Sequence, residues 1–423
     1  MFHQPYLPSA GTVIVLLATC FFPLEAQRNH EDYGDPNPWL GFENQEAGPD
    51  SATVANFLAS LSLSTPVVCQ MAVSTLGNNW GWNDHDRIDL LQAAAADEAA
   101  RQAVNRRVRD PRAIAHLMES LGAKHPCVRR AAARMLGNSG DTQAVRQLRQ
   151  ALRDQNPIRR EAAALGLAHA EDPASFHELT RALHDREPPV VRMAAYALGE
   201  LEDARAVKPL GEALGSKDPA TRATAAWALG EIEDIRAVGR LKELVRDEEP
   251  AVRLAAVEAL GEIEDYRATG SLAAALKEKD VRVRRAAAEA LGEVEDHKAA
   301  TPLTEALDDP DPVVRRLAAR ALGQLDGLKR APARLVTALG DRDAELAIIA
   351  AMSLGEIGDT VAVPALASAY RSDNPRFRYS VVSALAELED HRGDAVLNTA
   401  SHDRDQAVRH KAAEALRDRD DDD

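Results

Sequence analysis

Few residues of this chain have the types and spacing that metal or acid–base chemistry requires. Asp84, His85 and Asp86 stand together in the segment NNWGWNDHD (78–86), where carboxylates and an imidazole could ligate a metal ion. The same segment also reads as a loop that caps or reshapes the first structural units, or as a loop that docks a partner through its two tryptophans. We favour the capping loop and keep partner docking and metal binding as alternatives.

The motifs of nucleophilic, phosphate and thiol chemistry are absent or broken. No G-x-S-x-G elbow occurs. The stretch GEALGSK at Gly211–Lys217 is one residue too short for a phosphate-binding loop. The cysteines form no C-x-x-C pair, which excludes that type of zinc or redox site. Acidic pairs such as Glu233-Asp234 recur at one spacing, which indicates helix caps and solvated turns. We therefore predict no catalytic residue, no metal and no cofactor.

The overall charge argues against one class of partner. The chain has 51 Lys and Arg against 67 Asp and Glu, a net charge of −16. Nucleic-acid-binding proteins usually present a basic face, so we predict no nucleic-acid partner. Aromatic residues make up 4% of the chain and hydrophobic residues 45%. The apolar content is mostly Ala, Leu and Val, which suits closely packed helices.

The N-terminal apolar run, Thr12–Phe22, has about half of the roughly 20 residues that a membrane-spanning helix needs. It fits the apolar part of a secretory signal with cleavage after Ala26, although no Lys or Arg precedes Arg28. We expect residues 1–26 to be a signal peptide and the mature protein to be exported, either periplasmic or secreted. A lipid anchor on Cys20 is the alternative. No other segment is apolar for long enough to span a bilayer, so we expect no stable membrane insertion after signal removal.

An internal repeat organises the rest of the chain. The motif ALGEIED occurs at Ala228–Asp234 and again at Ala259–Asp265, with close variants on both sides. A period near 31 residues indicates a solenoid. We predict about twelve units over residues 51–417, degenerate over 51–110 and regular over 111–417. The glycine of the motif stands at Gly137, Gly166, Gly199, Gly230, Gly261, Gly292, Gly323 and Gly355.

One unit, Asp203–Glu233, shows why each repeat should be a helical hairpin. Asp203 is a suitable N-cap for a first helix over Ala204–Leu214. Asp218 and Pro219 begin the second helix, where the missing N–H of proline costs nothing. Neither helix can bury its apolar stripe alone, but stacked units bury it against their neighbours. The predicted fold class is therefore all-α, an α-solenoid.

The recurrent glycine has a structural explanation. Counted from it along the second helix, positions −4, −1 and +2 are apolar and lie on one face, so they should form the core. The glycine lies beside that face near the helix end. Without a Cβ, it should let the next unit approach closely, and we assign it no catalytic role.

The pattern DPxVRxxAAxALGEIxD followed by RAVxxL resembles the HEAT-like repeats first noted in phycobilisome lyase subunits. The resemblance covers residues 51–417 and implies the fold much more than the function. In such repeats an Asp before the second helix and an Arg inside it commonly bond along the stack, and their i, i+4 spacing would also allow a bond within one unit. The matching pairs are Asp218 with Arg222, Asp280 with Arg284, and Asp311 with Arg315.

Some proteins with such repeats are enzymes. The HEAT-like deoxyhypusine hydroxylase binds two irons through His-Glu dipeptides on adjacent repeats. Here the only His-Glu dipeptides are His30-Glu31 and His177-Glu178, and neither falls in a second helix. The bilin lyases share the repeat, but nothing in this sequence identifies a tetrapyrrole site. An enzyme or enzyme subunit, lyase-like or metal-dependent, with a site not evident from sequence is therefore the alternative function.

Three columns of residues on the second helices indicate a binding face. Positions −7, −3 and +1 from the glycine avoid the predicted core face, and position −3 changes freely between units. Second helices usually line the concave side of a solenoid, so we predict a non-catalytic scaffold that binds a protein or peptide there. Aromatic anchors with a polar rim are typical of such sites, although both rings could instead be packing between units. The candidate binding residues are Arg192, Tyr196, Glu200, Trp227, Glu231, Glu258, Glu262 and Glu289.

The flanking segments carry three further expectations. Residues 27–50 are rich in Pro, Gly, Asn and Asp and should form a flexible linker. Residues 418–423 form an acidic tail that should be disordered. Cys69 and Cys127 should lie two units apart, about 20 Å at typical helix spacings, too far for a disulfide. We therefore expect both to be free thiols.

Overall fold

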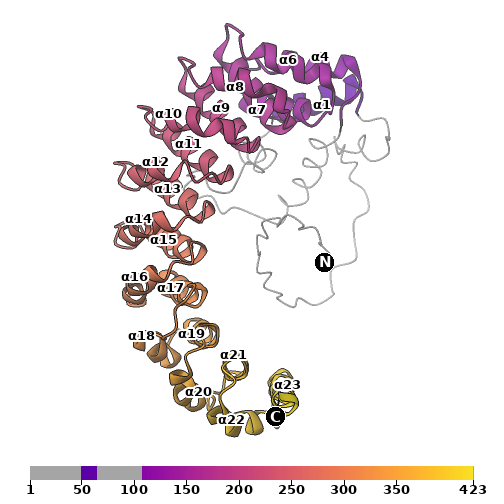
Figure 1. Cartoon of the computed structure of the whole chain (residues 1–423). Helices are drawn as coiled ribbons and strands as arrows, with labels where there is room; N and C mark the ends of the chain where they lie inside the picture. The colour runs from indigo at the N-terminus through magenta and orange to yellow at the C-terminus, as the bar shows by residue number, and fades with distance from the viewer. Residues whose placement is uncertain (1–48, 64–106, 423) are drawn as a thin grey trace, which may run out of the picture. The chain divides into compact units, whose positions relative to one another are not determined.

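The computed structural model describes residues 49–63 and 107–422, all within one compact unit, Trp39–Asp423. The described part begins with α1 (Ser51–Leu63) and continues from α4 (Pro111–Ser120) as ten consecutive helical hairpins (Figure 1). This is the predicted α-solenoid. The predicted signal peptide, nearly all of the linker and the segment 78–86 lie outside the described residues.

In each hairpin a short first helix leads into a longer second helix. The first helices after α4 are α6 (Thr142–Ala151), α8 (Phe176–Ala182), α10 (Val207–Ala213), α12 (Val238–Leu244), α14 (Thr269–Ala275), α16 (Ala300–Ala306), α18 (Ala333–Thr337), α20 (Val363–Ala369) and α22 (Asp394–Ala400). The second helices are α5 (Pro126–Gly137), α7 (Pro157–Ala170), α9 (Pro188–Glu200), α11 (Pro219–Glu231), α13 (Pro250–Glu262), α15 (Val281–Glu293), α17 (Pro312–Gln324), α19 (Ala344–Ile357), α21 (Pro375–Glu387) and α23 (Gln406–Asp422).

The predicted caps form as the sequence suggests. The Asp218 carboxylate accepts the N–H of Thr221 at 3.0 Å, and α11 begins at Pro219. The Asp203 carboxylate accepts the N–H of Arg205 at 2.9 Å. The predicted first helix Ala204–Leu214 is divided, however, into a 3₁₀ turn (Ala204–Ala206) and α10. The division places Pro209 in the first turn of α10, where its missing N–H leaves no hydrogen bond unmade.

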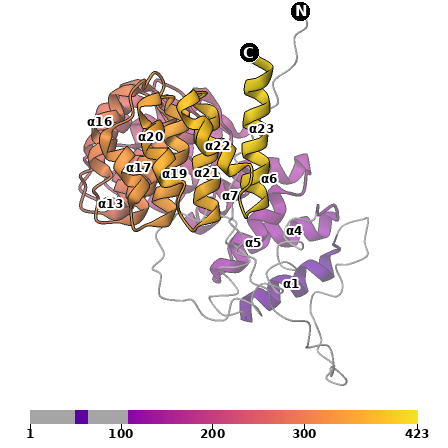
Figure 2. The ribbon, with the colours of Figure 1, turned by 90° about the horizontal axis from the view of Figure 1, so that it is seen from below.

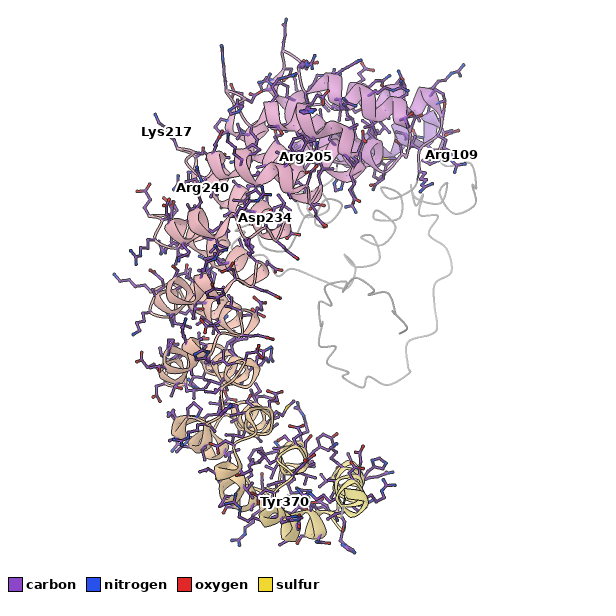
Figure 3. The ribbon with its side chains drawn as sticks, in the orientation of Figure 1. Arg109, Arg205, Lys217, Asp234, Arg240 and Tyr370 are labelled. Atoms are coloured by element: carbon purple, nitrogen blue, oxygen red, sulfur yellow. The ribbon has the colours of Figure 1, made fainter. Side chains whose placement is uncertain are left out.

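The two kinds of helix form two layers. Each second helix packs on the second helices of the units before and after it, whereas each first helix packs mainly on the second helix of its own hairpin. Figure 1 shows the second helices along the inner side of the curved stack, and Figure 2 shows α19, α21 and α23 side by side. Consecutive first helices are joined more loosely: Arg240 of α12 donates to the Gly211 carbonyl of α10 at 2.8 Å (Figure 3).

The glycines allow the close approach of the second helices. A Cβ added to Gly230 would lie 2.9 Å from the Cα of Ala259, and one added to Gly199 would lie 2.9 Å from the Cα of Ala228. Real Cβ atoms do not approach backbone atoms this closely, so the close-approach explanation is confirmed. The predicted core columns at −4 and −1 are buried as well, with the leucines at −1, such as Leu229, fully buried, whereas the column at +2 is only partly buried at Leu201, Ile232 and Ile357. The inner layer is tight because Ala and Gly face each other across it.

Arginine–aspartate pairs link the units, but not with the partners that the sequence suggested. Arg222 Nε and Nη2 donate to Asp247 of the next unit at 2.8 and 2.7 Å, and Arg284 binds Asp309 in the same way. Pairing of Arg222 with Asp218 within one unit is therefore wrong. The Asp218 carboxylate is turned toward the N–H groups that it caps, while the arginine lies along the turn and also donates to the Ser216 carbonyl at 2.9 Å.

The second helices end in an unusual backbone conformation. Five glutamates that stand three residues after the glycine position have φ between 48° and 54°. They are Glu202, Glu233, Glu264, Glu295 and Glu389. This left-handed conformation costs a non-glycine residue roughly 1–2 kcal/mol. At the equivalent position of another unit the chain uses Gly358, with φ of 72°. The tight turn into the next first helix therefore imposes this conformation whichever residue is present.

The acidic tail is ordered up to Asp422, contrary to the prediction, because it continues α23. Arg419 explains the difference. Its Nη2 donates to the Leu385 carbonyl at 2.8 Å, and its Nη1 pairs with Asp394. The prediction of disorder considered only the acidic composition of the tail. It did not consider Arg419, which fixes the last turns of the helix to α21 and α22.

The prediction of free thiols is wrong for Cys127, which is disulfide-bonded. The prediction assumed that a complete unit stands between the first helices and α5. The structure shows α1 packed directly on α4 and α5. The spacing of about 20 Å therefore had no basis.

The tight glycine contact predicts an asymmetric response to the same substitution at two sites. Gly230→Val should lower the free energy of unfolding by about 1–3 kcal/mol, because its side chain meets the backbone of α13. Val is by itself the better helix former by a few tenths of a kcal/mol. Gly239→Val is the matched control, since a Cβ there meets nothing within 4 Å. Urea unfolding midpoints check both; an unchanged midpoint for Gly230→Val would reject the close-approach account.

Candidate functional site

Two aromatic rings form the centre of the candidate site. Tyr196 of α9 and Trp227 of α11 are stacked, with ring centroids 5.0 Å apart and planes inclined by 17°. Both residues are half-buried. A Cβ on Gly199 would lie 2.9 Å from the indole atom Cζ3, so the glycine makes room for the tryptophan. The sequence predicted that these rings are adjacent, and the structure brings them into direct contact.

A group of carboxylates extends from the aromatic pair along the same layer of helices. Partial burial, with the charges of Glu262 and Glu200, raises the pKa of Glu231 to about 7. Burial, with the charges of Glu289 and Glu262, raises the pKa of Glu258 to about 7. Burial raises the pKa of Glu200, helped by the charges of Glu171 and Glu202, and it raises the pKa of Glu262, helped by the charges of Glu233, Glu264 and Glu289. The site is therefore surrounded by like charges.

Glu293 belongs to this group, although the predicted set did not contain it. Burial, with the charges of Glu262 and Glu289, raises its pKa to about 7. The preceding unit makes room for the Glu293 side chain, because the Glu293 carboxylate occupies the space that a Cβ on Gly261 would need. Gln324 and Glu356 lie against Gly292 and Gly323 in the same way. The recurrent Gly-Glu dipeptide was the sequence signal for this contact.

Not all of the proposed binding columns are free. Arg192 lies 3.5 Å from the Asp218 carboxylate of the next unit, and Arg285 pairs with Asp311 at 2.7 Å. Arginines at position −7 therefore serve to join units. Ala223, at the same position of its own unit, is only 1% exposed. The expectation that position −7 avoids the core is thus wrong for Ala223, because the close approach of α9, α11 and α13 buries it.

Burial and the charges of Glu200 and Glu231 raise the pKa of Tyr196 above its ordinary value near 10, so its hydroxyl is protonated well beyond neutral pH. The site thus presents a phenol, an indole and several carboxylates. It contains no nucleophile paired with a base. Its carboxylates can attract a cation, and its aromatic faces can contact a cation or an apolar side chain.

Elsewhere in the described residues, no three His, Cys, Asp or Glu side chains are grouped so that they could hold a metal ion. The His177-Glu178 dipeptide is engaged otherwise: His177 packs edge-on against Phe176, and Glu178 accepts a hydrogen bond from Arg149 at 2.9 Å. The triad Asp84, His85 and Asp86 lies outside the part of the chain that the structure covers. None of the helices described here is both long and apolar enough to cross a membrane.

Solved structures with a similar course of the chain include an engineered protein, which is 19% identical, with 84% of this chain and 98% of that one covered and a TM-score of 0.49. They also include the complex of CpcE and CpcF of phycocyanin lyase from Nostoc sp. PCC7120 (25% identity, coverage 53% and 92%, TM-score 0.34). A third is human deoxyhypusine hydroxylase (24% identity, coverage 66% and 96%, TM-score 0.28). None of these likenesses extends to function.

No curated protein matches the sequence significantly. A family model of HEAT repeats does match, over residues 89–168, 114–197, 176–248, 237–323 and 332–417. These matches span well over half of the chain and coincide with the stacked hairpins. The chain therefore belongs to the HEAT-repeat family.

Proposed function

We propose that this protein is a non-catalytic scaffold that binds a cationic segment of another protein on the face of its second helices. The observation that carries the proposal is the stacked, half-exposed pair of Tyr196 and Trp227 beside a row of unpaired carboxylates. Within the described residues, no cation forms an ion pair with any member of this row. Its members are Glu200, Glu231, Glu258, Glu262, Glu289 and Glu293.

The absence of neutralising partners distinguishes these carboxylates from the aspartates of the turns. Asp247 and Asp309 are each bound by an arginine of the preceding unit. Like charges held close together destabilise a folded protein. A cationic partner would relieve this repulsion, so the row favours a ligand that carries Lys or Arg side chains. HEAT repeats generally mediate protein interactions, which supports a protein as the source of that segment.

The aromatic pair supplies the second half of the recognition. A guanidinium or ammonium group gains about 0.5–2 kcal/mol over an aromatic face, depending on its solvation. An apolar side chain next to it would cover the remaining exposed ring surface. The enzyme alternative has less support, because the described part of the site pairs no nucleophile with a base, although a pKa of about 7 at Glu231, Glu258 and Glu293 would suit acid–base chemistry.

We also propose that the mature protein acts outside the cytoplasm. The apolar run Thr12–Phe22 supports export, and so does the disulfide at Cys127, since disulfides persist mainly in oxidising compartments. N-terminal sequencing of the native protein should find a chain that begins at Gln27. A cytoplasmic protein that retains residues 1–26 would contradict this proposal.

The aromatic pair is tested by removing both rings. Tyr196→Ala with Trp227→Ala should weaken capture of the native partner from an envelope extract, and binding of an Arg- and Lys-rich peptide, by tenfold or more. The matched control is Ile235→Ala with Tyr266→Ala, which removes two side chains that are 57% and 65% exposed away from the site. Circular dichroism verifies folding. If the folded double variant binds partner and peptide with wild-type affinity, this face is not the site.

The raised pKa values predict opposite effects of pH on binding and stability. Between about pH 8 and pH 5.5, Glu231, Glu258 and Glu293 gain protons, so affinity for the cationic peptide should fall. The same glutamates have an ordinary pKa near 4.5 when unfolded, so over this window only the folded state takes up these protons. Their contribution to stability should therefore rise as the pH falls.

Binding isotherms and urea unfolding at several pH values measure the two trends. Glu231→Gln with Glu258→Gln should weaken binding at pH 8 and flatten its pH dependence. Affinity that increases toward pH 5.5 in the wild type would contradict the assignment of these carboxylates to the site.

A further inference from the structure

The distribution of charge along the repeat is uneven. Residues 107–160 contain twelve Lys and Arg but only four Asp and Glu, whereas the whole chain has a net charge of −16. The first described hairpins are therefore basic in an otherwise acidic protein. Such a separation favours a different kind of ligand at this end of the stack than on the glutamate row.

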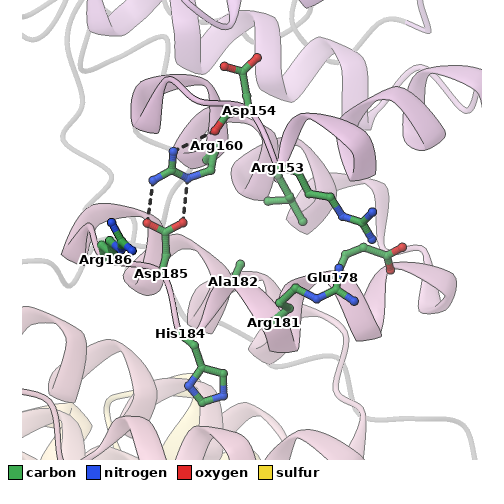
Figure 4. A pocket seen from close by; sticks show the side chains of 10 residues that line it. Arg153, Asp154, Arg160, Glu178, Arg181, Ala182, His184, Asp185 and Arg186 are labelled. Atoms are coloured by element: carbon green, nitrogen blue, oxygen red, sulfur yellow. Dashed lines mark hydrogen bonds and ion pairs between the residues drawn. The ribbon is translucent and has the colours of Figure 1, made fainter.

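A recess of about 380 Å³ lies where the turn before α7 meets α8 and the turn before α9 (Figure 4). Arg153 enters it from the first turn and Arg181 from α8, on either side of Glu178 (Figure 4). His184 and Arg186 line it from the second turn. The volume falls within the roughly 300–1,000 Å³ of ordinary ligand sites.

The acidic side chains of this recess each have an arginine partner, although Oε2 of Glu178 is buried without a hydrogen bond. Arg160 donates to both oxygens of Asp185 at 2.7 and 2.8 Å, and Arg149 binds Glu178 at 2.9 Å. Asp154 lies 3.2 Å from Arg159. In contrast, Arg153, Arg181 and Arg186 are exposed and have no ion-pair partner among the residues that the structure describes.

Comparison of units within the chain shows that this basic character is local. Arg181 stands eighteen residues before Gly199. The residues eighteen before the next glycines include Glu212, Glu243 and Glu305. The turn aspartate, by contrast, is retained as Asp185, Asp247 and Asp309 because it joins the units. Repeat packing therefore does not require an arginine at position 181.

We propose that this recess binds a phosphate or sulfate ester group, held by the guanidinium groups of Arg153 and Arg181, which lie on the same side of the recess (Figure 4). Guanidinium forms paired, charge-assisted hydrogen bonds with such oxyanions. The recess exceeds the size of one phosphate, so its ligand carries a second anionic group or an organic part. The site is separate from the aromatic pair and does not depend on the function proposed for it.

Isothermal titration of the full mature chain with pyrophosphate and with sulfate, at constant ionic strength, tests the site. Arg153→Gln with Arg181→Gln should reduce pyrophosphate affinity at least tenfold. Arg246→Gln with Arg371→Gln is the matched control, because both are exposed turn arginines of other units and should leave affinity unchanged. Flotation with phosphatidic acid vesicles, against phosphatidylcholine vesicles, distinguishes a lipid headgroup from a soluble phosphate ester.

Three outcomes would overturn the proposal. The first is a wild-type chain that binds neither pyrophosphate, sulfate nor phosphatidic acid vesicles. The second is undiminished affinity in the folded Arg153→Gln and Arg181→Gln variant. The third is an equal loss in the control variant, which would show general attraction to arginines and no built site.

Discussion

The contact between a glycine of one second helix and the next second helix is the constraint on which the rest of this structure depends. Gly230 lies so close to Ala259 that not even one methyl group fits between the helices at that point. The first helices, which lack such contacts, are joined mainly by side chains such as Arg240. Helices that approach closely on one side and loosely on the other must form a curved stack, with the glycine side inward.

The same contact brings the glutamates together. In the later units the residue after the glycine lies against the glycine of the preceding unit, as Glu293 does at Gly261. Carboxylates that recur once per unit are thereby close enough that the charge of Glu262 helps to raise the pKa of Glu231. The acidic row is a geometric result of the packing, and the row in turn favours a cationic ligand.

Arginines have two distinct roles in the repeat. Where an aspartate of the next turn faces them, as with Arg222 and Asp247, they join consecutive units and are nearly buried. Where they form no ion pair within the described residues, as with Arg153 and Arg181, they remain exposed beside a recess. The net charge of −16 hides this difference, so a prediction of partners from total charge describes the chain only on average.

The sequence by itself determined the period, the hairpin, the caps and the core columns. Each of these depends on residues within one unit, such as Asp218, Pro219 and Leu229, and recurs often enough to be recognised. It also determined that Tyr196 and Trp227 are neighbours, since equivalent positions of adjacent units must lie side by side.

Tertiary structure alone decided which partners meet between units. Three findings depend on contacts between separate helices: Asp247 as the partner of Arg222, the burial of Ala223 and the ordering of the acidic tail by Arg419. A repeat pattern states that two positions are alike. It does not state how far each unit is displaced along its neighbour, and that displacement selects the side chains that touch.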